Sequence, residues 1–184
     1  MVRAAIGNSY RLHTRYLTPG RIEDALKTRE IDIGMTYLRL PVEEVTYTKI
    51  GNFRMRIFGT SLNLGKKLED LRFVIPIDGV SMPGVLLRSL DGWPDDQFPR
   101  HVQYEFELLE SALQVAKTGR AVVYCPDFVV ALHNAEVPSS KKLVEIEPPK
   151  NFKEKNLSIF LVVRRNEPES RFARSLAKLV RSFS

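Results

Sequence analysis

The sequence predicts an α/β fold with largely parallel sheets, because strand-like and helix-like segments alternate along most of the chain. Residues 107–128 show this alternation most clearly. A helical segment ends at Gly119, a residue free to adopt the positive φ that often terminates a helix, and the apolar strand Ala121–Tyr124 follows. Pro126 has no N–H group for a strand ladder, so it marks a loop, and Asp127 can cap the next helix. Open α/β sheets bind ligands at such loops, beyond the carboxyl ends of buried strands.

The helical segment before Gly119 has one apolar face. Its apolar residues recur at the i, i+1, i+4, i+7 and i+8 spacing of a buried helix face. These residues are Leu108, Leu109, Ala112, Val115 and Ala116. We therefore expect this face to pack against the strand that follows it.

The composition indicates a globular chain with a full core. The 184 residues, of which 43% are hydrophobic, suffice for one domain or two small lobes. No segment resembles a signal peptide or approaches the ~20 apolar residues of a membrane span, so we expect a cytoplasmic protein. The single cysteine excludes an internal disulfide and a cysteine-rich metal site. The net charge of +6 is compatible with nucleic-acid binding, but acids and bases are mixed along the chain, which favours an ordinary solvated surface.

The beginning of the chain has a strand pattern followed by a helix pattern. Val2–Ile6 reads as a strand, and Tyr10–Leu17 suits either a strand or a weak helix. Thr18 and Pro19 are typical of an N-cap and a first helical residue, and the helix they open is expected to reach Arg29.

The middle of the chain alternates further. Ile31–Thr36 has a strand pattern, and Glu43–Gly59 alternates as one long bent strand or as a strand pair. Phe73–Ile77 reads as a buried strand, and Pro83 opens a helix expected to reach Leu90. His101–Phe106 is a strand that leads into the helical segment described above.

Two segments are candidates for connections between lobes. The first is the alternating segment Val42–Ile57, and the second is the strand Leu157–Val163. The closing helix, Pro168–Phe183, follows the second of them. The predicted division is a first lobe of residues 1–42 and 164–184 and a second lobe of residues 43–163.

Three motifs, in this order, resemble those of LysR-type transcriptional regulators. Ile31-Asp32-Ile33-Gly34-Met35 resembles the Ile-Asp-Ile-Gly element that forms the third strand of their effector-binding domain. Leu71–Pro76 looks like the strand that opens the second lobe of that domain, and Val115–Pro126 looks like its glycine-containing helix-to-strand element. The match in order and spacing covers most of the chain from Gly20 onward. The resemblance implies two Rossmann-like lobes of the type 2 periplasmic-binding-protein class.

Two features differ from the family pattern. No winged helix-turn-helix segment precedes Val2, so we expect that this chain does not bind DNA by itself. The family also usually has a further long helix before the helix predicted at Pro19. Either the first lobe is truncated, or residues 2–17 hold a compressed version of it.

The resemblance implies a sensor that binds a small effector in the cleft between its lobes and relays closure to DNA-binding modules. It also suggests a homodimer, and it leaves open whether the regulator activates or represses. Hydroxyl, amide and backbone N–H groups in the implied ligand loops suit a carboxylate or another small anion. The implied ligand-binding residues are Asn8, Ser9, Tyr10, Thr36, Tyr37, Asp78, Gly79, Val80, Ser81, Cys125 and Pro126.

Several of these residues also have a purely structural interpretation. Asn8 and Ser9 can cap a helix, and Ser81 can be the N-cap of the helix predicted after it. Tyr37 can be a packing residue. Cys125, on a buried strand, is typical of a small core residue.

The sequence offers little for catalysis. His13, His101 and His133 do not have the spacing of metal ligands, and no phosphate-binding loop or Gly-x-Ser-x-Gly motif occurs. Cys125 has only His133 nearby as a potential base. We therefore expect no catalytic residue, no metal and no cofactor. The alternatives are a free-standing cytoplasmic solute-binding protein, or an enzyme on the same fold, which would need an acid or base in its cleft.

The closing helix carries basic residues along one side. These are Arg171, Arg174, Lys178 and Arg181. We interpret this side as a solvated face rather than as a stripe that binds DNA or a membrane.

Overall fold

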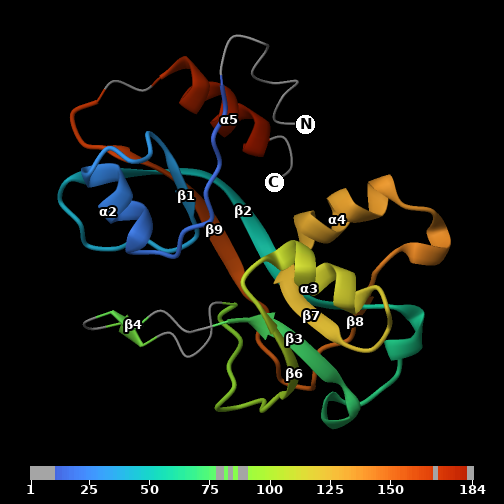
Figure 1. Cartoon of the computed structure of the whole chain (residues 1–184). Coiled ribbons are helices and arrows are strands. Elements are labelled where there is room, and N and C mark those ends of the chain that lie inside the picture. Colours follow the sequence, from blue (N-terminus) through green and yellow to red (C-terminus); the bar gives the residue numbers. More distant parts are fainter. Residues whose placement is uncertain (1–10, 78–80, 83–84, 87–90, 168–169, 182–184) are drawn as a thin grey trace. The chain divides into compact units, whose positions relative to one another are not determined.

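The computed structural model describes residues 11–77, 81–82, 85–86, 91–167 and 170–181, and the chain divides into two units (Figure 1). Unit 1 comprises Met1–Phe53 and Leu157–Ser184, and unit 2 comprises Arg54–Asn156. The division falls inside the two long strands β2 (Val45–Gly59) and β9 (Asn156–Arg164). The division predicted from the sequence, after residues 42 and 163, assigned more of both strands to the second lobe.

Unit 1 contains α2 (Arg21–Lys27), β1 (Gly34–Thr36) and α5 (Arg171–Arg181), together with one half of β2 and most of β9. β1 pairs antiparallel with β9, and β9 lies next to β2. The buried core joins the helix to these strands through Ile22, Leu26, Val45 and Val162. Gly34 must be glycine because a Cβ there would lie 2.4 Å from Cγ2 of Ile22.

The helix α2 in unit 1 begins later than predicted. Gly20, with φ of 90°, precedes the first helical residue Arg21, so the N-cap is not Thr18. The Glu23 carboxylate accepts a hydrogen bond from the Gly20 N–H at 2.6 Å, which satisfies one of the free donors at the helix start. The predicted strand Ile31–Thr36 is reduced to β1, and the predicted strand Val2–Ile6 lies outside the described residues.

The end of α2 is fixed by an arginine from a distant part of the chain. The Arg164 guanidinium donates hydrogen bonds to the carbonyl oxygens of Leu26 at 3.0 Å and Ile31 at 2.6 Å. The Leu26 carbonyl lies in the last turn of α2, where it also accepts the Arg29 N–H, and Ile31 lies beyond the helix, so Arg164 ties the helix end to the segment that leads to β1. Arg29 adopts a φ of 62° just beyond the helix, where the chain reverses toward β1.

Unit 2 is built on a mixed sheet rather than on the largely parallel sheet that the sequence predicted. The second half of β2 pairs antiparallel with β7 (Val122–Pro126) and β8 (Val144–Ile146). β3 (Arg72–Pro76) pairs parallel with β7 and with β6 (His101–Phe106). The sheet is mixed because β2 runs antiparallel to β7 and β8, whereas β3 runs parallel to β6 and β7.

A separate two-stranded ladder contradicts one predicted helix. β4 (Ser81–Met82) pairs antiparallel with β5 (Val85–Leu86), so the helix expected from Pro83 to Leu90 is wrong at Val85 and Leu86. Short 3₁₀ turns complete the described part of unit 2. They are η1 (Ser61–Asn63), η2 (Leu68–Asp70) and η3 (Ser139–Lys141).

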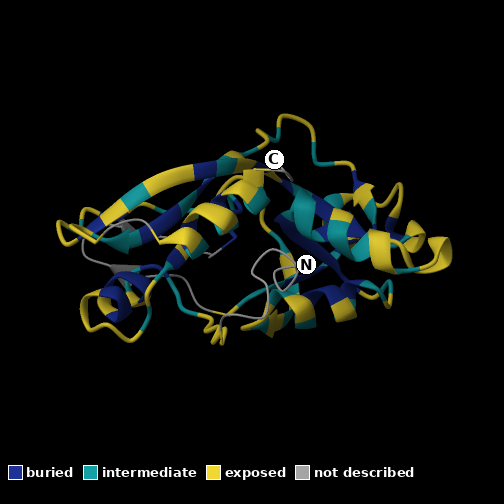
Figure 2. Cartoon of the chain, turned by 90° about the horizontal axis from the view of Figure 1, so that it is seen from above, coloured by how far each residue is buried: buried dark blue, intermediate teal, exposed yellow. Residues whose placement is uncertain are grey.

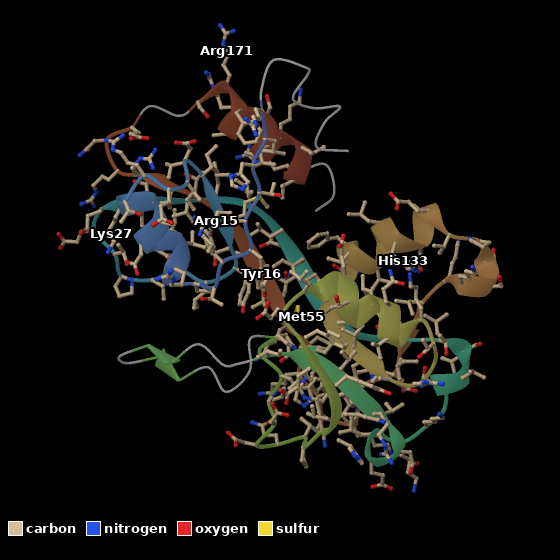
Figure 3. The ribbon with its side chains drawn as sticks, viewed as in Figure 1. Arg15, Tyr16, Lys27, Met55, His133 and Arg171 are labelled. Atoms are coloured by element: carbon tan, nitrogen blue, oxygen red, sulfur yellow. The ribbon has the colours of Figure 1, made fainter. Side chains whose placement is uncertain are left out.

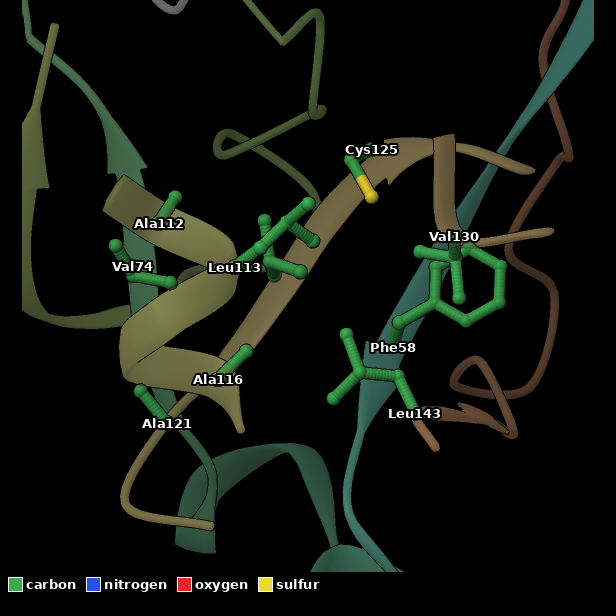
Figure 4. Packing of buried hydrophobic residues seen from close by; sticks show 10 residues of the cluster. Phe58, Val74, Ala112, Leu113, Ala116, Ala121, Cys125, Val130 and Leu143 are labelled. Carbon is green, nitrogen blue, oxygen red and sulfur yellow. The ribbon is translucent and has the colours of Figure 1, made fainter. Parts of the chain in front are cut away.

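The two faces of the sheet in unit 2 are covered differently. Side chains alternate across a strand, so Val123 and Cys125 face one side of β7 and Tyr124 faces the other. The first side packs with α3 (Leu109–Ala116) and α4 (Asp127–Glu136) in a hydrophobic cluster (Figure 4). The members of this cluster are Phe58, Val74, Ala112, Leu113, Ala116, Ala121, Val123, Cys125, Val130 and Leu143. The second side carries an aromatic cluster of Phe73, Trp93, Phe98, Tyr124 and Phe152.

The predicted apolar face of α3 is correct apart from its first residue. Ala112 and Ala116 are buried, whereas Leu108 is 49% exposed. Leu108 has an extended backbone and precedes the helix, so its side chain does not follow the helical spacing, and Leu113 is buried instead. The helix ends as predicted, with Gly119 at a φ of 74°.

The burial of individual residues agrees with the packing described for the two units (Figure 2). β7 is buried along nearly its whole length, whereas α3 and α4 alternate between buried and exposed residues. In α5 the buried residues are Ala173 and Ala177, and Arg171 points outward (Figure 3). No helix in the described ranges has the length and apolar character needed to cross a membrane.

Candidate functional site

The first candidate ligand loop lies at the carboxyl end of β1. Thr36 is buried, and its hydroxyl makes two hydrogen bonds with the next-but-one residue, accepting from the Leu38 N–H at 3.1 Å and donating to the Leu38 carbonyl at 3.3 Å. Tyr37, between them, is half-buried. These contacts hold residues 36–38 in a fixed turn. Asn8, Ser9 and Tyr10, predicted as a neighbouring ligand loop, lie outside the described residues.

An arginine that the sequence analysis missed follows this turn. The Arg39 guanidinium lies over two rings, 5.8 Å from the centre of Tyr47 and 5.7 Å from that of Phe160. The two rings pack edge to face at 6.3 Å. The two distances from the Arg39 guanidinium to the ring centres are within the range of cation–π attraction. The sequence signal was an arginine three residues beyond the Ile-Asp-Ile-Gly strand, but only the fold brings the rings beneath it.

The ring of Tyr47 is itself held in place. Its hydroxyl donates a 2.5 Å hydrogen bond to the Glu23 carboxylate and accepts one from the Leu40 N–H at 3.2 Å. Burial and the hydrogen bond to Glu23 both raise the pKa of Tyr47. Glu23 is 1% exposed, so a buried carboxylate holds Tyr47, one of the two rings over which Arg39 lies.

The second candidate loop follows β7 in unit 2. Cys125 is 1% exposed and belongs to the hydrophobic cluster described above, where Figure 4 shows its sulfur among apolar side chains. Burial raises the pKa of the Cys125 thiol, which keeps it protonated, the opposite of what a nucleophile needs. Pro126 is the last residue of the strand and lies opposite Met55.

The helix that follows this loop carries its own carboxylate at its N-terminus. Asp127 accepts hydrogen bonds from the Phe128 N–H at 2.9 Å and from Nε of Arg54 at 3.0 Å. A carboxylate at this end of a helix is favourable because the helix dipole is positive there. Asp127 therefore occupies the position that an anionic ligand of α4 would take, and it also pairs with the nearby Arg54.

The third candidate loop is described only at its end. Asp78, Gly79 and Val80 lie outside the described residues, and Ser81 opens β4 opposite Leu86. The role of these residues as a ligand loop stays a prediction.

A buried ion network holds the segment that follows. The Arg100 side chain is 1% exposed and donates hydrogen bonds to Asp91 at 2.6 Å and to both oxygens of Asp95 at 2.9 Å. Its guanidinium also lies over the rings of Phe73 and Trp93, at 5.7 and 5.2 Å. Asp95 belongs to a Gly- and Pro-rich stretch of the sequence, where a charged side chain is usually solvated. The buried arginine that pairs with it was not recognisable from the sequence.

One polar atom of the aromatic cluster has no hydrogen-bond partner among the residues that the structure describes. Tyr124 is 2% exposed, and its hydroxyl makes no hydrogen bond with any residue that the structure describes. Burial raises the pKa of Tyr124 to about 12. A cavity of about 10 Å³ lies beside it, lined also by Met55, Ile57 and Phe152. This volume is near the minimum for one water molecule, so the cavity cannot hold an organic effector.

The described residues contain no group of three or more His, Cys, Asp or Glu side chains that could hold a metal ion. His133 lies on α4 (Figure 3), and its Nε2 atom is buried without a hydrogen-bond partner in the described part of the chain.

Comparison with known proteins agrees with the fold. The sequence profile of the LysR substrate binding domain matches residues 9–184. The regulatory domain of HypT from Salmonella typhimurium, bound to a bromide ion, is similar with a TM-score of 0.69 and 11% identity, over 98% of this chain and 85% of that one. A search of curated protein sequences gave no significant match.

Two further solved structures are similar. The effector-binding domain of a BenM variant has a TM-score of 0.61 and 19% identity, over 99% of this chain and 84% of that one. The reduced form of the OxyR regulatory domain from Pseudomonas aeruginosa has a TM-score of 0.60 and 14% identity, over 89% of this chain and 79% of that one. Because the profile match covers nearly all of the chain, it also establishes the type 2 periplasmic-binding-protein-like fold. The chain therefore belongs to the LysR substrate-binding domain family, and it is a ligand-sensing regulatory domain.

Proposed function

We propose that this domain senses a small anion, of which a carboxylate is the simplest form, and that effector binding controls DNA-binding modules of the same regulator. The observation that carries the proposal is the family match over residues 9–184. In this proposal the chain does not bind DNA by itself, and it acts in the cytoplasm, where its target DNA is. LysR-type regulators are typically oligomeric, and we propose that this domain forms a homodimer.

The proposed ligand-binding groups lie at the carboxyl ends of β1 and β7. In unit 1 they are the side chains and backbone of Thr36 and Tyr37. In unit 2 they are the backbone groups at Cys125 and Pro126, because the Cys125 thiol is buried in the core. By their position in the family pattern, the proposal also includes Asn8, Ser9, Tyr10, Asp78, Gly79, Val80 and Ser81.

The charge distribution supports an anionic effector. Unit 1 contains fourteen lysine and arginine residues and eight aspartate and glutamate residues, whereas unit 2 contains fourteen of each. The whole net charge of +6 therefore belongs to unit 1. A positive field attracts anions and raises their local concentration. The bromide ion bound by the regulatory domain of HypT is consistent with this chemistry.

A ligand screen by thermal unfolding tests the proposal. Small carboxylates are compared with their neutral amides at constant ionic strength, so that screening by salt is the same in both arms. A ligand at 100 times its Kd stabilises the folded state by about 2.7 kcal/mol, so a carboxylate effector raises Tm and its amide does not. Equal shifts with acid and amide would exclude recognition of the charge. A panel in which neutral compounds alone raise Tm would replace the proposal with a neutral effector.

The proposal involves no catalysis and no cofactor. An effector recovered chemically unchanged after prolonged incubation with the protein supports a sensor, and a product that appears in proportion to protein concentration would support an enzyme. The homodimer is tested separately by the mass in solution, measured by light scattering across a dilution series.

A further inference from the structure

We infer that Arg39 binds the negatively charged group of the effector, an inference that rests on the proposed function. The ligand-binding residues expected from the family pattern offer hydroxyl, amide and backbone N–H groups, but no cation. An oxyanion that leaves water needs strong donors, and hydrogen bonds from a charged group are about twice as strong as neutral ones. Arg39, two residues beyond Tyr37, supplies the missing charge.

The guanidinium of Arg39 is held but not neutralised. It lies over the rings of Tyr47 and Phe160, which contact its face. No acidic side chain in the described part of the chain pairs with it, although the residue is exposed. Stacking on a ring occupies the face of a guanidinium and leaves the N–H groups at its edge available. An anion can therefore accept hydrogen bonds from Arg39 without first displacing a carboxylate.

The backbone on both sides of Arg39 is fixed before any ligand binds. On one side, the Thr36 hydroxyl is hydrogen-bonded to the N–H and the carbonyl of Leu38. On the other side, the Leu40 N–H donates to the Tyr47 hydroxyl, which is bonded in turn to Glu23. Binding to a group that is already ordered costs less conformational entropy than ordering a free side chain.

Several other arginines of unit 1, and the arginine next to the second candidate loop, are already paired. Arg54, next to the loop after β7, is bonded to Asp127. Arg15 pairs with Glu30, and Arg164 pairs with Asp32 and Glu167. An anion bound by one of these residues would compete with a carboxylate of the protein. Arg39 combines a charge that no acidic side chain of the described ranges pairs with, a fixed position and proximity to a predicted ligand loop.

The chemistry of the site defines the class of ligand. The planar fork of N–H groups matches two oxygens of a carboxylate, and it also matches two oxygens of a phosphate. The shared feature is an oxyanion that accepts two parallel hydrogen bonds. In the experiment below, acetate represents a carboxylate ligand and inorganic phosphate represents a phosphate ligand, so the two classes are distinguished.

The experiment follows the arginine Nε–H resonances of the ¹⁵N-labelled protein by NMR during titration with acetate and, separately, with inorganic phosphate at constant ionic strength. Arg165 is the internal reference, because it is also an exposed arginine of unit 1 and has no ring beneath it in the described structure. We expect the Arg39 signal to reach half-saturation at a concentration at least about tenfold lower than the Arg165 signal, in at least one of the two titrations. Equal half-saturation of both signals in both titrations would overturn the inference.

Matched variants give a second test. Arg39→Gln removes the charge from an exposed side chain, and Arg165→Gln removes an equal charge elsewhere in unit 1. We expect the first to weaken binding of an identified effector at least about tenfold and the second to change it less than about twofold. Arg39→Lys keeps the charge but loses the planar fork, so it should lie between wild type and Arg39→Gln.

The outcomes separate this inference from the proposed function. An effector that stabilises wild type and Arg39→Gln equally would exclude Arg39 and leave the sensor function intact. A panel in which no anion stabilises the wild-type protein would exclude the anionic effector, and the role of Arg39 with it.

Discussion

The Tyr47 hydroxyl donates a 2.5 Å hydrogen bond to the Glu23 carboxylate, which joins the long strand β2 to the helix α2 in unit 1. Glu23 also accepts the N–H of Gly20 at the start of that helix. One buried carboxylate therefore orders a helix start, and it holds a ring on which Arg39 rests. A charge on the inner face of a short helix is unusual, since a buried carboxylate without partners is strongly unfavourable. Here both partners of the Glu23 carboxylate, the Gly20 N–H and the Tyr47 hydroxyl, are hydrogen-bond donors.

The first prediction concerns Tyr47→Phe. The variant keeps the ring but removes the donor, and it leaves the buried Glu23 carboxylate with one partner fewer. We expect the free energy of unfolding to fall by about 2 kcal/mol, because hydrogen bonds to charged groups contribute more than neutral ones. Urea unfolding measures the change. Tyr104→Phe, which alters a half-buried tyrosine on β6, is the control and should change stability by less than about 0.5 kcal/mol.

The second prediction concerns alkaline pH. The folded state raises the pKa of Tyr47, and it raises that of Tyr124 to about 12, whereas an unfolded tyrosine titrates near 10. A raised pKa means that the folded state holds the proton more tightly. The contribution of these two tyrosines to stability is therefore fully present below about pH 10 and is lost as the pH rises above it, because the unfolded chain releases protons first.

The measurement is the urea midpoint between pH 8 and pH 12, for the wild type and for the double variant Tyr47→Phe/Tyr124→Phe. We expect the wild type to lose more stability than the double variant across this range. Parallel curves for the two proteins would show that these tyrosines do not cause the alkaline loss.

The third prediction concerns Tyr124→Phe alone. Because the hydroxyl is buried with no hydrogen bond in the described structure, its removal should leave stability unchanged or increase it by about 1 kcal/mol. A loss of more than about 1 kcal/mol would contradict the absence of a partner. It would indicate that a water molecule in the neighbouring cavity of about 10 Å³ is bonded to the hydroxyl.

The fourth prediction concerns the ion network of unit 2. Arg100→Met removes the guanidinium that donates hydrogen bonds to Asp91, whose side chain is 3% exposed, and to Asp95. We expect a loss of about 3–5 kcal/mol, because removing one partner of a buried ion pair is strongly destabilising. The double variant Arg100→Met/Asp91→Asn should recover part of the loss. Glu105→Gln, an exposed change on β6, is the control, and a similar effect of both single variants would show that burial of the pair is unimportant.

Local patterns in the sequence predicted much of unit 2 correctly. The strand His101–Phe106, the helix face with Ala112 and Ala116, and the glycine turn at Gly119 all depend on interactions within a few residues. The prediction failed for Val85 and Leu86, where a proline suggested a helix start but the residues pair as a strand. Strand pairing depends on a partner segment, so a local signal does not determine it.

In the candidate site, too, the sequence predicted residues that are close together in the chain and missed a group that depends on distant segments. The family motifs led to Thr36 and Tyr37, because the Ile-Asp-Ile-Gly strand and the loop after it are continuous in sequence. Arg39 could not be recognised as a candidate binding residue, since the two rings beneath it come from different strands, Tyr47 from β2 and Phe160 from β9.

The sequence by itself determined the family, the α/β class, and the short elements whose apolar spacing and turn residues are local. The tertiary structure alone decided which charges are buried and paired, as for Glu23 with Tyr47 and Arg100 with Asp91. It also decided which charge lies over a pair of rings with no acidic partner in the described part of the chain, as for Arg39. The physical reason is that the free energy of a charge depends on the solvent and partners around it, and those partners come from distant parts of the chain.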